Sequence, residues 1–230
     1  MMPLSEIAHR RLFPSITDPN FLVLRSRRLI FTSWANSLGD EPLRVLDVGG
    51  KYQPYRPLLG TRISRYIAVD LKRSDFVTVV ASGEALPFPP ESFDLVIATQ
   101  VFDYFDDPQE AARQIHSVLR PRGVLLASMP ACAPRFANDE KWRFTPSGLR
   151  SVFSPFAHVN ILPEVSNAGS FLRMTNLAMN SFLPWNSVRW AYNATICPVL
   201  NLLGLGLESL SLTTSDQFAA NYSVRATKAD

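Results

Sequence analysis

The sequence contains only two cysteines and three histidines among its 230 residues. Cys132 and Cys197 lie far apart in the chain, so they fit neither a zinc-binding spacing nor a disulfide framework. His9, His116 and His158 are equally scattered. We therefore expect no metal site, and a reducing compartment is the simplest setting for two unpaired thiols.

The chain also lacks a strong charge excess and a long uninterrupted apolar run. Its formal net charge of +3 gives no reason to expect nucleic-acid binding. The first residues contain no signal-peptide core, which predicts a cytoplasmic location. The apolar stretch 194–207 is too short and too interrupted to span a bilayer. Burial within the protein, peripheral membrane contact and a homodimer through 186–207 are its three interpretations.

What is present is an apolar run, 45–48, that ends directly at Gly49 and Gly50. A strand stopped by glycines predicts the first turn of a βαβ unit, facing a nucleotide or nucleoside. The two glycines would allow a positive φ and the close approach of a ligand. Asp47 falls near the carboxyl end of this strand, where open α/β sheets bind ligands.

A second acid, Asp70, ends the next apolar run, 67–70. An acid at this position accepts hydrogen bonds from ribose hydroxyls, which both dinucleotides and S-adenosylmethionine carry. A dinucleotide site requires the pattern G-x-G-x-x-G, and the second and third glycines are absent here. This absence weakens the hypothesis of a nicotinamide-dependent oxidoreductase.

Six segments, taken together, resemble the class I S-adenosylmethionine-dependent methyltransferases, and in particular the methyltransferase type 11-like domain. They are VLDVG (45–49), VD (69–70), EALPF (84–88), SFDLV (92–96), QVF (100–102) and VLRPRGVLL (118–126), in the family's order and spacing. The sequence departs from the family at Lys51, where a glycine is usual, and at Ser82, where an acid usually accepts from the adenine amino group. The Pro54-Tyr55 pair resembles a branch found among bacterial surface-polysaccharide enzymes.

The alternation of predicted strands and helices indicates an α/β fold with a doubly wound, mostly parallel sheet. The resemblance implies seven strands, the last of them antiparallel at 217–228. We expect one domain over 1–230: a surface arm at 1–19 and a helix at 20–38, a core at 43–165, and an apolar helical insertion at 168–210. The third strand is expected at 76–80, and Pro184 and Pro198 are expected to break the insertion. Asp107 and Thr145 each precede a proline and predict helix N-termini, with Glu110 completing a capping box after Asp107.

The resemblance also implies a set of site residues. Asp47 would meet the ammonium end of the cofactor, directly or through water, and Asp70 would meet the ribose. The other expected cofactor contacts are Gly49, Gly50, Leu71, Ser82, Gly83, Glu84 and Gln100. Asp103 is the candidate general base, beside Tyr104, where family members often have a histidine.

Trp142 and Arg143 are expected on the substrate side of this site. Trp142 would stack on a sugar face and Arg143 would hold an anion. The alternative is that Trp142 packs the loop while Arg143 pairs with Asp139 or Glu140.

The sequence thus predicts methyl transfer from S-adenosylmethionine to an oxygen of a small-molecule or saccharide acceptor. The alternative is a cofactor-binding or regulatory protein of the same fold that has lost catalysis. Lys51, Ser82 and Tyr104 are the residues that motivate this alternative.

Overall fold

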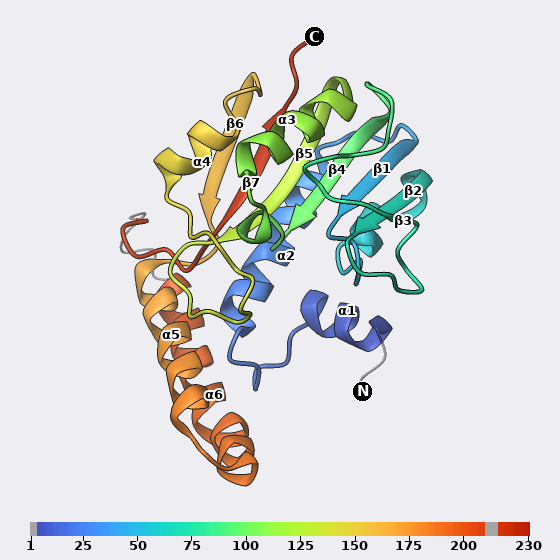
Figure 1. Ribbon diagram of the computed structural model, residues 1–230. Helices are drawn as coiled ribbons and strands as arrows, with labels where there is room; N and C mark the ends of the chain where they lie inside the picture. The colour runs from blue at the N-terminus through green and yellow to red at the C-terminus, as the bar shows by residue number, and fades with distance from the viewer. Residues whose placement is uncertain (1–3, 210–215) are drawn as a thin grey trace.

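The computed structural model describes residues 4–209 and 216–230, which form a seven-stranded sheet with helices on both faces (Figure 1). The strands are β1 (Leu43–Val48), β2 (Ile63–Asp70), β3 (Val79–Val80), β4 (Phe93–Thr99), β5 (Leu119–Pro130), β6 (His158–Pro163) and β7 (Asn221–Thr227). Their order is β3-β2-β1-β4-β5-β7-β6. The first five strands pair in parallel, and β7 is antiparallel to both β5 and β6. The predicted mostly parallel seven-stranded sheet with an antiparallel last strand is confirmed.

The helices divide between the two faces of the sheet. One face is covered by α1 (Leu4–Leu12) and α2 (Phe21–Asn36), and the other by α3 (Pro108–Val118) and α4 (Pro146–Val152). Two short 3₁₀ helices, η1 (Arg56–Arg62) and η2 (Phe102–Tyr104), follow β1 and β4. Helices α5 (Asn167–Phe182) and α6 (Asn186–Ser209) pair with each other and project away from the sheet (Figure 1).

Strand β1 shows why both faces of the sheet are covered. Successive side chains in a strand point to opposite faces. Val45 packs in the cluster that contains Phe31 of α2, whereas Leu46 and Val48 pack in the cluster that contains Ile115 of α3. The strand is therefore buried on both sides, as its nearly continuous apolar sequence predicts.

The helix starts expected from the sequence are present. Asp107 accepts hydrogen bonds from the backbone N–H groups of Gln109 and Glu110, and Thr145 caps α4. The capping box was wrong: the Asp107 N–H donates to the carboxylate of Glu84, 2.7 Å away, and not to Glu110. The Glu110 carboxylate instead binds side chains of its own helix.

Two other expectations differ from the structure near the beginning of the chain and at the third strand. Part of the predicted surface arm, residues 4–12, forms α1, because its apolar residue Leu12 packs against α2. The third strand contains only Val79 and Val80, because the chain turns just before it, with the Val77 N–H bonded to the Ser74 carbonyl.

Of the two prolines expected to break the insertion, Pro184 lies between α5 and α6, but Pro198 lies inside α6. Contacts on either side of Pro198 offset the backbone hydrogen bond that it cannot make. The Asn201 side chain donates to the carbonyls of Ile16 and Asp18, at 2.7 and 3.0 Å, and Cys197 contacts the same loop. These contacts attach α6 to the α1–α2 connection. None of the helices within the described ranges is apolar enough over a sufficient length to cross a membrane.

Candidate active site

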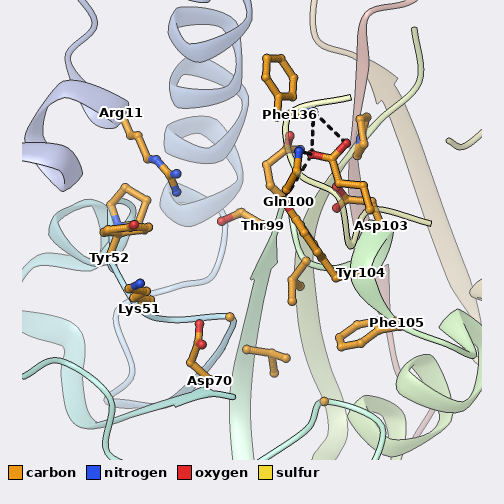
Figure 2. Close-up of a pocket in the computed structure, with 18 of the residues that line it drawn as sticks. Arg11, Lys51, Tyr52, Asp70, Thr99, Gln100, Asp103, Tyr104, Phe105 and Phe136 are labelled. Carbon is orange, nitrogen blue, oxygen red and sulfur yellow. Dashed lines mark hydrogen bonds between the residues drawn. The ribbon is translucent and has the colours of Figure 1, made fainter. Parts of the chain in front are cut away.

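A cavity of about 930 Å³ opens at the carboxyl ends of the central strands (Figure 2). Part of its wall comes from the loops that follow β1, β2, β3 and β4, as expected for an open α/β sheet. The predicted site residues that line the cavity are Gly49, Asp70, Leu71, Gly83, Glu84, Gln100, Asp103, Tyr104 and Arg143. Asp47, Gly50, Ser82 and Trp142 are not part of its wall.

The two glycines after β1 have different roles. Gly49 adopts a φ of 74°, and a Cβ there would lie 2.9 Å from a methyl group of Val101, so the turn requires glycine. Gly50 does not have a positive φ, and the prediction for it was wrong. A Cβ at Gly50 would lie 2.8 Å from the Asp47 carbonyl and 2.9 Å from Ala68, so packing behind the turn explains this glycine.

Asp70 lies at the tip of β2 and points toward the cavity (Figure 2). Its Oδ1 accepts the backbone N–H of Lys72 at 2.8 Å, while Oδ2 makes no hydrogen bond within the described part of the chain. The side chain of Leu71, which follows, is 70% exposed at the edge of the cavity. A free carboxylate oxygen beside an exposed apolar side chain suits a ribose joined to a flat base.

Asp47, in contrast, does not line the cavity, and its expected contact with the cofactor, directly or through water, stays a prediction. The alternation along β1 places Asp47 on the same face as Val45, where its carboxylate accepts a hydrogen bond from the Tyr66 hydroxyl at 2.7 Å. Burial raises the pKa of Asp47 to about 7, opposed by the Tyr66 hydrogen bond and assisted by the charge of Asp70. Asp47 and Asp70 are neighbours, but only Asp70 reaches the cavity.

The turn expected at the adenine edge is shaped by Ser82. Its hydroxyl accepts the backbone N–H of Glu84 at 3.1 Å, which places Gly83 and Glu84, but not Ser82, in the wall. A Cβ at Gly83 would lie 2.6 Å from the Phe105 ring, so this position accommodates no side chain. Ser82 therefore acts on the shape of the turn and does not replace the missing acid in the wall.

Gln100 follows β4 and holds the end of that strand against β5. Its backbone adopts a φ of 53°, which is uncommon outside glycine. Its N–H donates to the Ser128 carbonyl at 2.7 Å, and its side-chain amide donates to the Ser128 hydroxyl at 3.1 Å. These two contacts fix the position of Gln100 in the wall.

Asp103 is a buried carboxylate with an unused oxygen. Only 4% of the residue is exposed, and Oδ1 has no hydrogen-bond partner among the residues described. Burial raises the pKa of Asp103 to about 6, and the charge of Glu140 acts in the same direction, against Arg143. A cavity-lining carboxylate whose pKa lies near neutrality has the properties of a general base.

Tyr104, the next residue, is engaged in a different contact. Its hydroxyl donates to Glu140 at 3.3 Å, and burial raises the pKa of Tyr104 to about 12. It therefore remains a neutral phenol at physiological pH.

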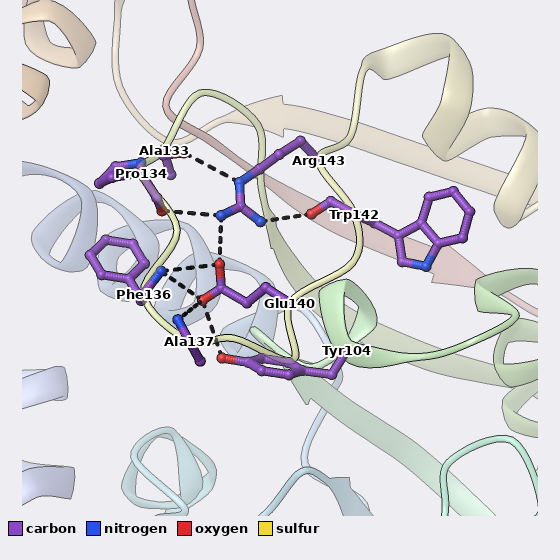
Figure 3. A network of polar contacts seen from close by, with 8 residues as sticks. All are labelled: Tyr104, Ala133, Pro134, Phe136, Ala137, Glu140, Trp142 and Arg143. Atoms are coloured by element: carbon purple, nitrogen blue, oxygen red, sulfur yellow. Dashed lines mark hydrogen bonds and ion pairs between the residues drawn. The ribbon is translucent and has the colours of Figure 1, made fainter.

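Glu140 organises the segment 131–145, which we call the cover segment because it lies over the cavity (Figure 3). Its carboxylate accepts the backbone N–H groups of Phe136 and Ala137, each at 3.1 Å. It also pairs with Arg143 at 2.6 Å and accepts from Tyr104. Arg143 thus forms the pair with Glu140 that the alternative interpretation gives, and its guanidinium holds the cover segment together.

Trp142 also follows the alternative interpretation. Its ring points away from Glu140 and Arg143 (Figure 3), it is not part of the cavity wall, and its indole N–H donates to the Phe105 carbonyl at 2.8 Å. The backbone N–H groups of Lys141 and Trp142 donate to the Asp103 carbonyl at 2.7 and 3.2 Å. The expected stacking of Trp142 on a sugar is corrected: the residue ties the cover segment to η2.

The remaining wall comes from α1, α2 and α5, which we call the helical half of the cavity. Its basic residues are Arg10, Arg11, Arg27 and Arg173. Sequence reasoning did not assign them to the site, because none belongs to a motif of the sheet. The apolar residues 4, 7, 8 and 12 recur at helical spacing and could have revealed α1.

Arg27 of α2 is held by a buried ion pair. Its Nε and Nη2 donate to the two carboxylate oxygens of Glu164 at 2.8 and 2.9 Å. Glu164 Oε1 also accepts the hydroxyls of Ser128 and Ser223, at 2.6 and 2.9 Å. This network joins α2 to strands β5 and β7 below the cavity. Tyr55 is buried here against Phe31, with its hydroxyl 3.5 Å from Arg27 Nη1.

Within residues 4–209 and 216–230, no cluster of three or more His, Cys, Asp or Glu side chains has the arrangement of a metal site.

Comparison with known families identifies the centre of the chain. Residues 46–127 match the family model described as "Methyltransferase domain". This segment belongs to the methyltransferase domain family. It contains the end of β1, all of β2, β3, β4 and α3, and most of β5, and with them the strand-end half of the cavity. The resemblance to class I S-adenosylmethionine-dependent methyltransferases is confirmed.

Two curated relatives illustrate how far the similarity extends. The chain is 32% identical over 107 residues to "Arginine-hydroxylase NDUFAF5, mitochondrial" of Rattus norvegicus, which is 43% of this chain and 30% of that protein. It is 29% identical over 154 residues to "Malonyl-[acyl-carrier protein] O-methyltransferase 1" of Coxiella burnetii, which is 61% of this chain and 50% of that protein. The chain thus spans between about a third and a half of the length of these relatives.

A solved structure shows the same fold over nearly the whole chain. The 1,6-didemethyltoxoflavin-N1-methyltransferase of Burkholderia thailandensis superimposes with a TM-score of 0.53 at 16% identity, covering 90% of this chain and 79% of that one. That structure contains S-adenosylhomocysteine, the product form of the cofactor. S-adenosylmethionine is the cofactor of the class I methyltransferase domain to which residues 46–127 belong.

Proposed function

We propose that this chain transfers a methyl group from S-adenosylmethionine to an oxygen of a small-molecule or saccharide acceptor. The observation that carries the proposal is a cavity whose wall contains Asp70, with one carboxylate oxygen that no described residue binds, and the buried carboxylate of Asp103. S-adenosylmethionine supplies an electrophilic methyl group on a cationic sulfur. The residues of this chain bind the cofactor and the acceptor, align them, and remove a proton from the acceptor.

The strand-end half of the cavity fits an adenosyl group. The free oxygen of Asp70 is available to the ribose hydroxyls, and the exposed side chain of Leu71 offers an apolar surface to the base. Gly49 and Gly83 leave space that a Cβ would fill. Alignment of the reacting groups supplies most of the acceleration in such a displacement, so these contacts serve catalysis by holding geometry.

Asp103 is the residue that we propose as general base. An acceptor hydroxyl must lose its proton as the new bond to oxygen forms, and the Asp103 carboxylate lies in the wall of the cavity, where it would receive that proton. Tyr104 is a positioning residue, because its hydroxyl holds Glu140 and with it the cover segment. The name of the Coxiella burnetii relative, an O-methyltransferase, supports oxygen as the atom methylated.

The proposal is tested with purified protein, S-adenosylmethionine and a panel of hydroxylated small molecules and saccharides, following release of S-adenosylhomocysteine. D103N is expected to lower turnover by ~10²- to 10⁴-fold while calorimetry shows unchanged affinity for S-adenosylhomocysteine. The control is D75N, which removes an exposed acid that does not line the cavity. Absence of S-adenosylhomocysteine binding in the unaltered protein would refute the proposal.

A second candidate function is cofactor binding without methyl transfer. It is favoured by Lys51 and Ser82, which depart from the family pattern, and by Tyr104, whose hydroxyl is occupied by Glu140. One relative is named as a hydroxylase, which is a reaction other than methyl transfer. Binding of S-adenosylhomocysteine together with no turnover on the whole panel would select this candidate.

We further propose that α6 rests on a lipid surface. Four large apolar residues are each at least 59% exposed: Trp185, just before the helix, and Trp190, Val199 and Leu202 within it. No Asp or Glu occurs in the segment 165–207, so no negative charge opposes an anionic membrane. Exposed tryptophans beside apolar residues are typical of helices that lie in a membrane interface.

The membrane proposal is tested by sedimentation with vesicles of phosphatidylcholine and phosphatidylglycerol. The unaltered protein is expected to sediment, and the double variant W185S/W190S is expected to remain in the supernatant. A stable dimer in light scattering that the double variant abolishes, without vesicle binding, would show that a second copy covers this face instead. The cytoplasmic location remains a prediction.

A further inference from the structure

Arg173 is a buried cation that lacks a counter-charge. It lies in α5, is only 4% exposed, and lines the helical half of the cavity. Its Nε and Nη2 both donate to the side-chain carbonyl oxygen of Asn20, at 3.1 and 2.9 Å. Its Nη1 has no hydrogen-bond partner in the part of the chain that the structure describes, and no described carboxylate lies within ion-pair distance.

The charges of Glu164 and Asp18 act on Arg173 through space, but neither carboxylate forms an ion pair with it. Glu164 is paired with Arg27 through both oxygens. The carboxylate of Asp18 accepts the backbone N–H of Asn20 at 2.7 Å and makes no hydrogen bond to Arg173. Burial, assisted by the charge of Arg27, lowers the pKa of Arg173 to about 10, so the group is still a cation at neutral pH.

A buried, unpaired guanidinium is costly for a folded protein, and such charges are normally paired. Arg27, the other buried arginine in the described part of the chain, follows that rule through its ion pair with Glu164. At Arg173 the partner is a neutral amide, and one nitrogen is left over beside a cavity that also receives Arg10 and Arg11 from α1. The simplest source of the missing negative charge is a molecule that enters the cavity.

We propose that the acceptor carries an oxyanion, either a carboxylate or a phosphate, and that the guanidinium group of Arg173 binds it. Guanidinium groups recognise such oxyanions with directed, charge-assisted hydrogen bonds. The inference rests on the proposed function, because it describes the acceptor of the same cavity. It narrows the acceptor from any hydroxylated small molecule to an anionic one.

The test measures the unfolding temperature of the full chain in phosphate or in malonate against chloride at constant ionic strength, with and without S-adenosylhomocysteine. At least one of the two anions is expected to raise the unfolding temperature of the unaltered protein. In R173Q this rise disappears, with affinity for the anion ~10- to 100-fold weaker. R65Q, which removes an exposed arginine outside the cavity, keeps the rise.

A second readout separates an anion site from a structural role. In chloride alone R173Q is expected to be as stable as the unaltered protein or more stable, because it removes an uncompensated buried charge. An equal anion-induced rise in R173Q, or no rise in the unaltered protein with either anion, would overturn the inference.

The outcome also remains distinguishable from that of the proposed function. Calorimetry with S-adenosylhomocysteine alone tests the strand-end half of the cavity, whereas Arg173 belongs to the helical half. If the cofactor fails to bind while R173Q still abolishes the anion effect, methyl transfer is refuted and the anion site stands. Comparison of the phosphate and malonate arms shows which oxyanion the site prefers.

Discussion

Replacing Glu164 by Gln tests whether the buried pair with Arg27 holds the floor of the cavity. Glu164 is 1% exposed and Arg27 4%, and both carboxylate oxygens are used. Glutamine keeps the size of the side chain and one acceptor oxygen, so the main change is the loss of charge. E164Q then leaves the Arg27 guanidinium buried and unpaired, close to the equally uncompensated Arg173.

Removing one partner of a buried ion pair costs ~3–5 kcal/mol, because the other charge stays buried without compensation. For a chain of this length each kcal/mol lowers the unfolding temperature by roughly 2–4 °C, so E164Q should unfold ~6–20 °C below the unaltered protein. Urea denaturation followed by circular dichroism measures the free energy, and thermal unfolding gives the second value.

The matched control is E91Q. Glu91 is an exposed residue whose pair with Lys228 has an N–O distance of 3.9 Å, and such surface pairs contribute about 0–1 kcal/mol. The double variant R27Q/E164Q removes both charges and is expected to lose less free energy of unfolding than the sum of the two single variants. A loss in E164Q no larger than that in E91Q, or strict additivity in the double variant, would refute the reasoning.

Three further predictions follow from single side chains. D70N is expected to weaken S-adenosylhomocysteine binding in calorimetry by ~10- to 100-fold, since a charged acceptor for ribose hydroxyls is lost, whereas D75N leaves it unchanged. Because the pKa of Asp47 is raised to about 7, the folded state binds more protons than the unfolded state between about pH 4 and 7, and the free energy of unfolding falls as the pH rises through that window. D47N should remove this part of the pH dependence in urea titrations; an unchanged slope would show that Asp47 is not its source. G49A should cost ~1–3 kcal/mol, because its Cβ would lie 2.9 Å from a valine methyl at a φ of 74°, whereas G206A, with nothing within 4 Å of the added Cβ, should be neutral or stabilising.

The sheet could be predicted from the sequence because its signals are local. The motif SFDLV (92–96) lies in and just before β4, and Asp107 and Thr145 cap their helices with their own side chains. The errors occur where distant contacts decide the conformation. Pro198 continues a helix because Cys197 and Asn201 are held by a loop about 180 residues earlier in the chain.

The site residues were predicted less evenly for a similar reason. A motif gives the strand and the position along it, but a shift of one residue reverses the face. Asp70 is at a strand tip and reaches the cavity, whereas Asp47 is one residue before the end of its strand and faces Tyr66. The sequence placed Trp142 and Arg143 on the substrate side of the site, but only Arg143 lines the cavity. Their partners, the Phe105 carbonyl and Glu140, depend on how the cover segment folds.

The two halves of the cavity differ in how the sequence encodes them, and this difference bears on the acceptor. The strand-end half comes from the segment 46–127 that the methyltransferase family shares. The helical half depends on pairs far apart in the chain, Arg27 with Glu164 across 137 residues and Arg173 with Asn20 across 153. A relative that matches over 107 residues, as the one from Rattus norvegicus does, cannot contain both partners of these pairs within its matched region. Similarity in the methyltransferase domain therefore carries the cofactor from one protein to another but not the acceptor, which has to be sought through α1, α2 and α5 of this chain.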